Sequence, residues 1–218
     1  MIRAYLIAEL LLLILVKAGD LIGIPALLYN CLAFAAILLN AAVAFFFWRG
    51  SGRTRARGRE DLVAYALFVT LAGDVFLTLI GTEDVFVPGI LLFCAAEALY
   101  AVYLGPRAWS AGLQVILTAA GILVLQRSGD LSAASALGAL DLALLSVNMI
   151  TAWTRAEKKT PLLFKIGITL FFLCDSFIAL RMVTAGPVRE AAAFMVWVFY
   201  APSQVAITMS YVNKMREK

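Results

Sequence analysis

Five carboxylic acids lie inside long apolar stretches of this sequence, where a charged side chain is costly. They are Glu9, Asp74, Glu97, Asp141 and Asp175. At the centre of a membrane-spanning helix, each acid costs about 2.5–3.5 kcal/mol on insertion scales. Such acids persist when they face a polar cavity, pair with one another or carry a proton. We therefore expect Asp74 and at least some of the others to transfer protons or to bind a polar group.

Further polar side chains stand three, four or seven residues apart in the same apolar stretches, so that they share one face of a helix. By residue count they all lie near mid-depth, and one interior cavity could collect them. Hydrogen bonds between such side chains also hold membrane helices together, at about 0.6 kcal/mol each on average, and this simpler role stays open for the Tyr, Asn and Gln residues. The pairs are Glu97 with Tyr100, Asp141 with Asn148, and Tyr200 with Gln204.

The stretches that carry these residues have the composition of a membrane protein. Of the 218 residues, 63% are hydrophobic and 15% are charged, whereas soluble domains have about 45–50% and about 25%. Apolar runs long enough to cross the hydrocarbon layer as helices recur along the whole chain. The sequence therefore predicts an all-α, multi-pass membrane protein that forms a single domain over residues 1–218.

Turn residues and charges divide the chain into eight predicted spans. Interruptions such as "RGSGRTRARGRED", "GTED" and "TRAEKKTP" separate them. The first run begins like a secretory signal peptide, but it is too long and no cleavage-site pattern follows, so we interpret it as a span. The predicted spans are 2–19, 24–48, 61–81, 86–105, 109–126, 131–153, 161–184 and 191–212.

Basic residues are unevenly divided between the two sides of these spans. If the N-terminus lies inside, thirteen Lys and Arg residues fall on the inner side, against Lys17, Arg127, Arg181 and Arg189 on the outer side. This bias predicts that both termini are cytoplasmic. It also accounts for the basic segment "RGSGRTRARGR", so no nucleic-acid partner is expected. The compact loops favour a bacterial inner membrane.

A short segment of the third span is repeated in the seventh. "GDVFLTL" matches "CDSFIAL", which aligns Asp74 with Asp175. A tyrosine follows at a similar distance in the next span of each half, Tyr100 in the first and Tyr200 in the second. The pattern predicts two parallel four-helix repeats, residues 1–105 and 109–218.

Several kinds of chemistry are not expected from this sequence. The chain has no histidine, which excludes His-based triads, His proton shuttles and ordinary zinc sites. Cys31, Cys94 and Cys174 lie in apolar runs and predict buried thiols without a disulfide framework. Carboxylates alone can bind Mg²⁺ or Ca²⁺, but no spacing specifies such a site, so we predict no metal and no cofactor. The Gly-x-Gly-Asp signature of intramembrane aspartyl proteases is also absent at Asp74.

Four blocks of the sequence carry most of the acids and tyrosines considered above: "FVTLAGDVFLTLI", "GILLFCAAEALYAVYL", "FFLCDSFIALRM" and "VWVFYAPSQVAITMS". Together they resemble the YhhN family of membrane lysoplasmalogenases. The chain departs from the family pattern in three places. Glu97 stands where many members carry histidine, Cys174 replaces the serine before Asp175, and no lysine matches the Lys-Pro of the second span. The chain therefore resembles a divergent member.

The resemblance implies hydrolysis of the vinyl-ether bond of a lysophospholipid, lysoplasmalogen, with release of a fatty aldehyde. Protonation of the β-carbon gives an oxocarbenium ion that water attacks, so the reaction needs one neutral acid and one carboxylate. Two carboxyl groups in a poorly solvated cavity can hold these two states side by side. We expect Asp74 and Asp175 to be this catalytic pair. The expected binding or positioning residues are Glu97, Tyr100, Asp141, Asn148, Tyr200 and Gln204.

The same residues also fit another functional class. A small proton-coupled transporter or a lipid-binding membrane protein could use Asp74 and Asp175 to carry protons. Helices broken at matching places in both halves would favour a transporter, whereas Pro202 in the last span has no counterpart in the fourth. A catalytically inactive scaffold of the same fold is the third interpretation.

Overall fold

The structure, a computed structural model, describes residues 1–50, 58–155 and 160–217 of the 218-residue chain. All regular elements in these ranges are helices, which confirms the predicted all-α class. The elements are α1 (Ile2–Ile22), α2 (Ala26–Gly50), α3 (Asp61–Asp74), the π-helix η1 (Val75–Ile80), the 3₁₀-helix η2 (Glu83–Val85), α4 (Phe86–Leu104), α5 (Ser110–Ser128), α6 (Ala133–Trp153), α7 (Leu162–Val183) and α8 (Gly186–Arg216).

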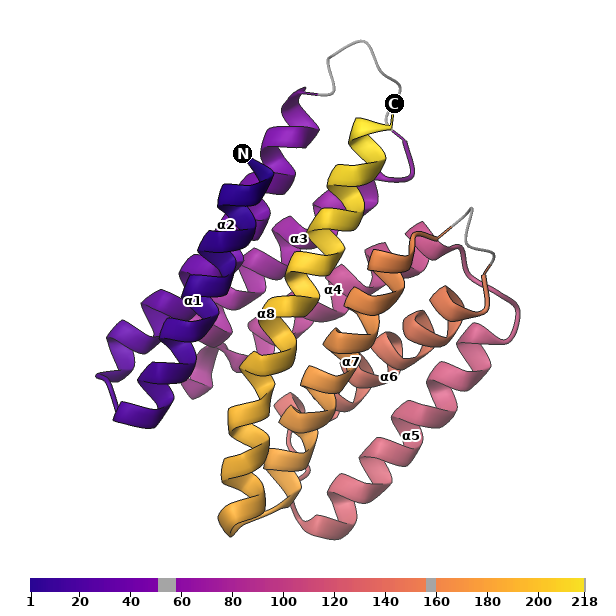
Figure 1. Ribbon diagram of the computed structural model, residues 1–218. Coiled ribbons are helices and arrows are strands. Elements are labelled where there is room, and N and C mark those ends of the chain that lie inside the picture. The colour runs from indigo at the N-terminus through magenta and orange to yellow at the C-terminus, as the bar shows by residue number, and fades with distance from the viewer. Residues whose placement is uncertain (51–57, 156–159, 218) are drawn as a thin grey trace.

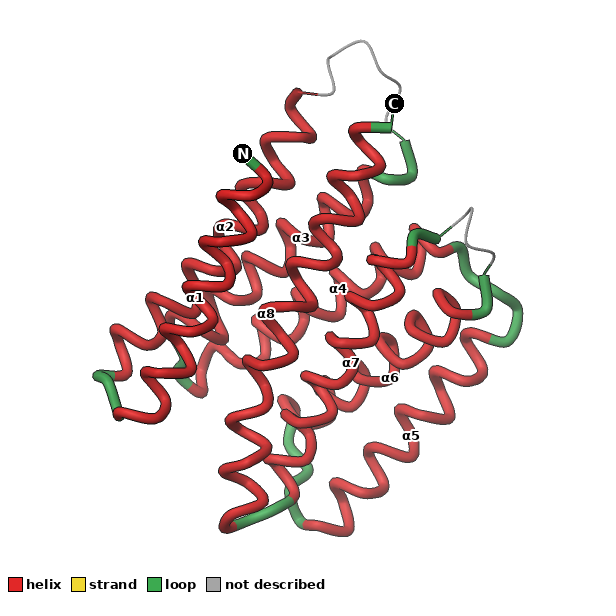
Figure 2. The backbone as a smooth tube through the Cα atoms, viewed as in Figure 1, coloured by secondary structure: helices red, strands yellow, loops and turns green. Residues whose placement is uncertain are grey.

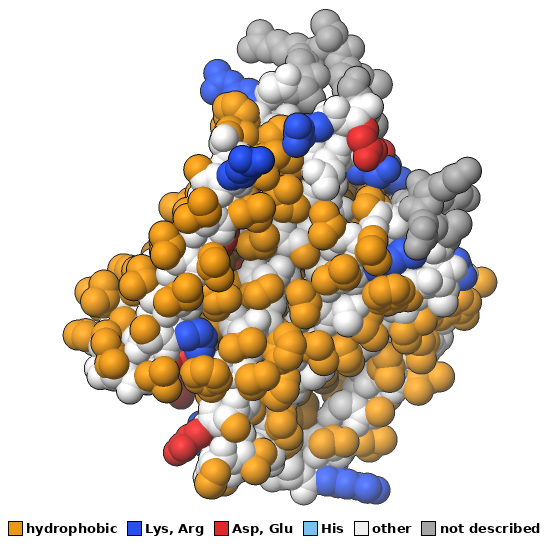
Figure 3. All heavy atoms as spheres, viewed as in Figure 1, with side chains coloured by type: hydrophobic (Ala, Val, Ile, Leu, Met, Phe, Trp, Pro, Cys, Tyr) orange, Lys and Arg blue, Asp and Glu red, His pale blue; other side chains and the backbone are white. Residues whose placement is uncertain are grey.

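Seven helices of the described chain are long and apolar enough to cross a membrane. They are α2, α3 continued by η1, η2 continued by α4, and α5 to α8. Figure 3 shows hydrophobic side chains over most of the visible face, as expected for helices surrounded by lipid tails. The protein is therefore a multi-pass membrane protein.

Charged residues are spread along the whole of the first predicted span. α1 carries Arg3, Glu9, Lys17 and Asp20 among its 21 residues, and it is not one of the seven apolar helices. Lys17 forms an ion pair with Asp20 and also donates to the backbone oxygen of Phe194 at 2.8 Å. α1 lies along α2 and contacts α8 (Figure 1). Its role as an eighth span stays a prediction.

The two halves of the chain show the same pattern of helix neighbours. Each helix contacts the next one from α1 to α4, and again from α5 to α8. Between the halves, α2 contacts α8 and α6 contacts α4, and these contacts correspond when α1–α4 is matched with α5–α8. The contacts of α8 with α1 and α3 have no counterpart of similar extent among the described helices. Both chain ends lie toward the same end of the bundle, and α5 lies at its edge (Figures 1 and 2). The parallel repeat and the cytoplasmic termini stay predictions.

The third predicted span, residues 61–81, changes its winding at Asp74. α3 ends at this residue, and the chain continues as the six-residue π-helix η1 before it turns at Gly81. The sequence predicts one uninterrupted helix here. Single π-helical turns inside helices occur frequently at functional sites, so the change of winding singles out Asp74.

Two glycines allow α3 and η1 to lie close against α4 at this point. A Cβ on Gly73 would lie 2.7 Å from the Phe93 ring and 3.3 Å from the backbone oxygen of Gly89, and a Cβ on Gly89 would lie 2.5 Å from Leu77. The Phe93 ring has little room to move, because it is 8% exposed and packs against Phe171. Small residues at such contacts are typical of closely packed membrane helices.

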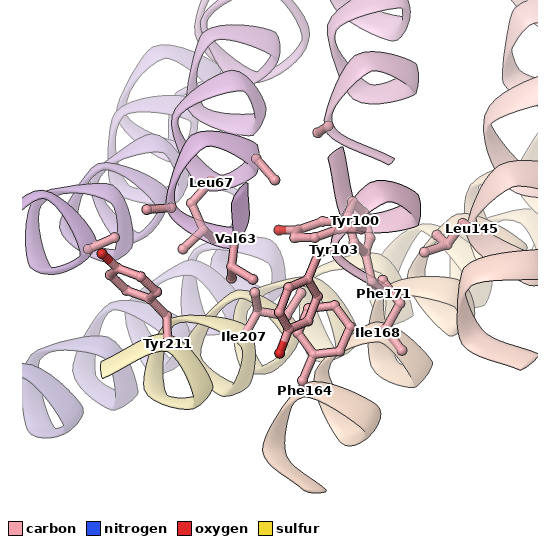
Figure 4. Close-up of a cluster of buried hydrophobic side chains, with 14 of the residues drawn as sticks. Val63, Leu67, Tyr100, Tyr103, Leu145, Phe164, Ile168, Phe171, Ile207 and Tyr211 are labelled. Carbon is pink, nitrogen blue, oxygen red and sulfur yellow. The ribbon is translucent and has the colours of Figure 1, made fainter. Parts of the chain in front are cut away.

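Buried apolar side chains fill the interior between α3, α4, α6, α7 and α8. The Phe164 ring lies 5.6 Å from the Tyr100 ring and 4.9 Å from the Tyr103 ring, measured between centroids. Figure 4 shows these three side chains together with Val63, Leu67, Leu145, Ile168, Phe171, Ile207 and Tyr211.

The prediction that all three cysteines are buried was wrong for one of them. Cys174 is buried and Cys94 is half-buried, but Cys31 on α2 is exposed. α2 is apolar almost throughout, so its sequence does not distinguish the side that faces lipid from the side that faces the bundle.

The contact at Gly73 can be tested with Gly73→Ala. In a helix with free space this change stabilises a protein by up to about 1 kcal/mol. At Gly73 the added methyl group must displace the Phe93 ring, so we expect a loss of about 1–3 kcal/mol, the usual cost of overpacking. Gly112→Ala is the control, because a Cβ there meets nothing within 4 Å. Thermal unfolding of the purified variants in detergent measures the difference, and an unchanged Tm for Gly73→Ala would contradict the close contact.

Candidate active site

Asp74 lies at the junction of α3 and η1 and is 2% exposed. The hydroxyl of Tyr200 donates to its Oδ2 at 2.5 Å, and the hydroxyl of Thr78 donates to its Oδ1 at 2.9 Å. Both oxygens of the carboxyl group therefore accept a hydrogen bond, which holds the side chain in one orientation. Sequence reasoning missed Thr78, although its position four residues after Asp74 is a signal that could have found it.

Aromatic rings surround the Tyr200 side chain. The centroid of its ring lies 5.4 Å from that of Trp197, 5.6 Å from that of Phe171 and 6.4 Å from that of Phe93. These rings come from α4, α7 and α8, so three helices together form the apolar wall around the Tyr200–Asp74 hydrogen bond. Such a wall keeps water away and strengthens polar contacts inside it.

Glu97 of α4 is fully buried and pairs with Asn148 of α6. The side-chain amide of Asn148 donates to Oε2 of Glu97 at 2.7 Å and to its backbone oxygen at 2.9 Å. The other carboxyl oxygen of Glu97, Oε1, has no hydrogen-bond partner in the part of the chain that the structure describes. A buried oxygen without a partner is a place where a ligand or a proton can bind.

Asp141 of α6 and Asp175 of α7 lie close enough to interact with each other, and Oδ1 of Asp141 has no hydrogen-bond partner among the described residues. Two ionised carboxylates would repel, so this contact is favourable when one of them carries a proton. Cys94 lies beside Asp141, and Cys174 lies beside Asp175. These two thiols therefore lie close to the acids, which sequence reasoning did not foresee, since it interpreted both as small apolar side chains.

These pairs form one cluster of acids. Asp175 interacts electrostatically with Asp74 and with Glu97, and Asp141 also acts on Glu97. The four acids come from α3, α4, α6 and α7, and Tyr200 reaches the cluster from α8. The structure thus places Asp74 on α3 and Asp175 on α7 close enough to interact electrostatically.

Two of the predicted site residues, Tyr100 and Gln204, are buried without a hydrogen bond to the acids among the described residues. The Tyr100 hydroxyl lies near Thr70, and its ring is part of the apolar core in Figure 4. Gln204 lies one turn after Tyr200 and is 1% exposed, and neither atom of its amide has a partner in the described ranges. Neither residue holds an acid in place, and their role in ligand binding stays a prediction.

Glu9 lies apart from this cluster. Its Oε1 accepts from the side-chain amide of Asn40 at 2.8 Å, and Asn40 in turn accepts from the Tyr5 hydroxyl at 2.6 Å. Glu9 lines a cavity of about 430 Å³ between α1 and α8, whose other walls are apolar. They include Leu6, Leu10, Leu13, Pro202, Val205 and Met209.

Two of the four acids accept hydrogen bonds from neighbouring side chains. Tyr200 and Thr78 donate to Asp74, and Asn148 donates to Glu97. Over residues 1–50, 58–155 and 160–217, no three side chains of His, Cys, Asp or Glu lie in an arrangement that could hold a metal ion.

A comparison with protein families agrees with the four sequence blocks. The model of the YhhN family matches residues 26–211. This range includes every predicted site residue and leaves out α1. No match to the chain is found among curated proteins or among solved structures. Because the matched range covers most of the chain, the protein belongs to the YhhN family.

Proposed function

We propose that this protein is a membrane-embedded hydrolase that cleaves the vinyl-ether bond of lysoplasmalogen or a related lysolipid by carboxylate acid–base catalysis. The observation that carries the proposal is the cluster of four acids, three of them buried and Asp175 half-buried, in which Asp74 and Asp175 interact electrostatically. Membership of the YhhN family, to which the lysoplasmalogenase activity is attached by resemblance, supports it.

Hydrolysis of a vinyl ether requires two carboxyl groups in different protonation states. Asp175 shares a contact with Asp141 that one proton stabilises, so we assign Asp175 as the proton donor. Asp74 accepts two hydrogen bonds from hydroxyl groups, which favour its ionised form against the opposing effect of burial. We therefore assign Asp74 as the carboxylate that stabilises the cation and activates water.

The proposed reaction consumes one water molecule and needs no other reagent. Asp175 protonates the β-carbon of the vinyl ether, which gives an oxocarbenium ion. Water then adds to the oxocarbenium carbon, and Asp74 takes a proton from this water. The hemiacetal then breaks down as Asp74 returns this proton to the leaving ether oxygen and Asp175 recovers a proton from the hemiacetal hydroxyl. The products are a fatty aldehyde and a glycerophospho-alcohol. Each proton transfer contributes about 10²–10⁴-fold to the rate.

The remaining predicted residues are assigned to substrate binding. Oε1 of Glu97 can accept a hydrogen bond from a glycerol hydroxyl of the substrate, because it has no partner among the described residues and Asn148 donates to the other oxygen. Asp141 keeps the proton of Asp175 in place through their contact. Tyr100 and Gln204 have polar atoms without partners among the described residues, and we assign them to the same glycerol portion of the substrate.

The proposal places eight spans in a bacterial inner membrane, with α1 as the first span and the two halves as parallel repeats. The corresponding helix neighbours of the two halves support the repeat. Both termini are cytoplasmic in this arrangement, which agrees with the basic side chains that gather at one end of the face in Figure 3. The lysolipid substrate enters from the surrounding bilayer, and no nucleic acid takes part.

A proton-coupled transporter is the second candidate. The change from α- to π-winding at Asp74 favours it, because interrupted helices near the membrane midplane form the ion sites of many transporters. The two candidates differ in their product. A transporter moves its solute unchanged, whereas a hydrolase releases aldehyde.

The topology predicts opposite labelling of two single cysteines. In a variant that lacks the three native cysteines, Thr82→Cys should react with an impermeant maleimide in intact cells, because the turn after η1 then lies outside. Ala108→Cys, in the turn after α4, should react only once the cells are broken. Both side chains are exposed. The reverse labelling pattern would contradict the cytoplasmic termini.

The acid pair predicts the effect of removing either proton-transferring group. Asp74→Asn and Asp175→Asn should each lower aldehyde release by at least about 10²-fold, and the double variant should be scarcely worse than the worse single variant. Glu9→Gln is the matched control, because Glu9 is also a buried acid but lies outside the cluster. Purified variants are compared by aldehyde release and by thermal unfolding. Turnover near that of the unmodified protein in either single Asp variant would exclude the assigned pair.

A further inference from the structure

Two arginines meet over the turn that ends α4, well away from the acid cluster. Gly105 closes α4 with a φ of 77°, a conformation that favours glycine, and it is buried. A Cβ on Gly105 would overlap Nη2 of Arg59 and would lie 2.9 Å from Nη2 of Arg155. The two guanidinium groups therefore lie side by side over this glycine, with like charges facing each other.

The ends of two helices hold this arrangement in place. Arg59 donates to the backbone oxygen of Val102 from Nε at 3.1 Å and from Nη2 at 2.8 Å. Arg107 donates from Nη2 to the backbone oxygen of Thr154 at 3.1 Å, directly before Arg155. Cations at the last carbonyl groups of a helix are favourable. These bonds use only part of the five N–H donors of each guanidinium, so donors remain for another group.

The positive charges of this cluster act on one another. Burial, followed by the charges of Arg59 and Arg107, lowers the pKa of Arg155. Glu60 is the nearby carboxylate, since it acts on Tyr103 together with Arg59 and Arg155. None of the three arginines forms an ion pair with a described residue. The cluster therefore has an excess of positive charge at its centre.

We propose that Arg59, Arg107 and Arg155 bind a phosphate group, that of a phospholipid head group at the membrane surface. Guanidinium groups match the geometry of phosphate oxygens and bind them through two parallel hydrogen bonds. The cluster lies where α4 and α6 end, at the level of lipid head groups, and basic pockets between membrane helices at this level bind anionic lipids. Topology explains why basic residues occur on this side, but not why three of them converge on one glycine turn. This inference is independent of the hydrolase reaction.

Binding of phosphatidylglycerol to the purified full-length protein in detergent, followed by native mass spectrometry, tests the proposal. Arg155→Gln is the main variant, because the Arg155 side chain donates no hydrogen bond to a described residue, whereas Arg59 and Arg107 hold helix ends. We expect Arg155→Gln to weaken binding at least tenfold. Arg155→Lys, which keeps the charge but loses the paired N–H donors, should bind more weakly than the unmodified protein and more tightly than Arg155→Gln. Arg127→Gln, at the exposed end of α5, is the control and should bind like the unmodified protein.

Two further ligands identify what is recognised. Diacylglycerol, which lacks phosphate, should not compete with phosphatidylglycerol for the unmodified protein. Inorganic phosphate that displaces the lipid would show that the phosphate group alone suffices, and phosphate that does not would show that the lipid is needed with it; both results support the site. Equal phosphatidylglycerol binding by Arg155→Gln and the unmodified protein would overturn the proposal, as would competition by diacylglycerol. If Arg155→Gln does not fold, as judged by thermal unfolding, the diacylglycerol competition and Arg155→Lys decide the question: a folded Arg155→Lys that binds phosphatidylglycerol like the unmodified protein would overturn the proposal.

Discussion

The cost of placing several carboxylic acids inside a membrane bundle governs this structure. Each acid needs a hydrogen-bond donor or a proton, because a bare buried carboxylate is strongly unfavourable. Tyr200 and Thr78 supply donors to Asp74, Asn148 supplies one to Glu97, and Asp141 and Asp175 share a contact. Most of these partners come from different helices. The acids therefore link α3 to α8, α4 to α6 and α6 to α7, in addition to the apolar core.

Packing and chemistry meet at the Gly-Asp pair of the third helix. Gly73 lets α4 approach closely, and the chain changes to π-winding directly after Asp74. Phe93, which fills the contact, also lies against the Tyr200 ring that donates to Asp74. A change in helix packing at this point would therefore move the carboxyl group and its donor together. Gly105, directly after the other end of α4, also has no side chain, and two arginines occupy the space that a Cβ would take.

The sequence predicts the helices better than it predicts the contacts between them. The predicted span 86–105 agrees with α4 (Phe86–Leu104), since apolar runs and turn residues are local signals. The Tyr200–Asp74 bond joins residues 126 positions apart, and the Asp141–Asp175 contact depends on how α6 and α7 are rotated; neither follows from spacing alone. The repeated Asp motif did single out Asp74 and Asp175, which interact electrostatically in the structure. The π-helix and the exposed Cys31 were missed, because both depend on packing against neighbouring helices.

The central claim is that a buried carboxylic acid protonates the β-carbon of a vinyl ether. The most direct measurement is to incubate the purified protein with lysoplasmalogen in heavy water and to trap the aldehyde at once for mass spectrometry. The carboxyl proton exchanges with the solvent, so the account predicts an aldehyde with one deuterium atom on the carbon next to the carbonyl group. Aldehyde without this deuterium, or no aldehyde at all from the folded protein, would contradict it.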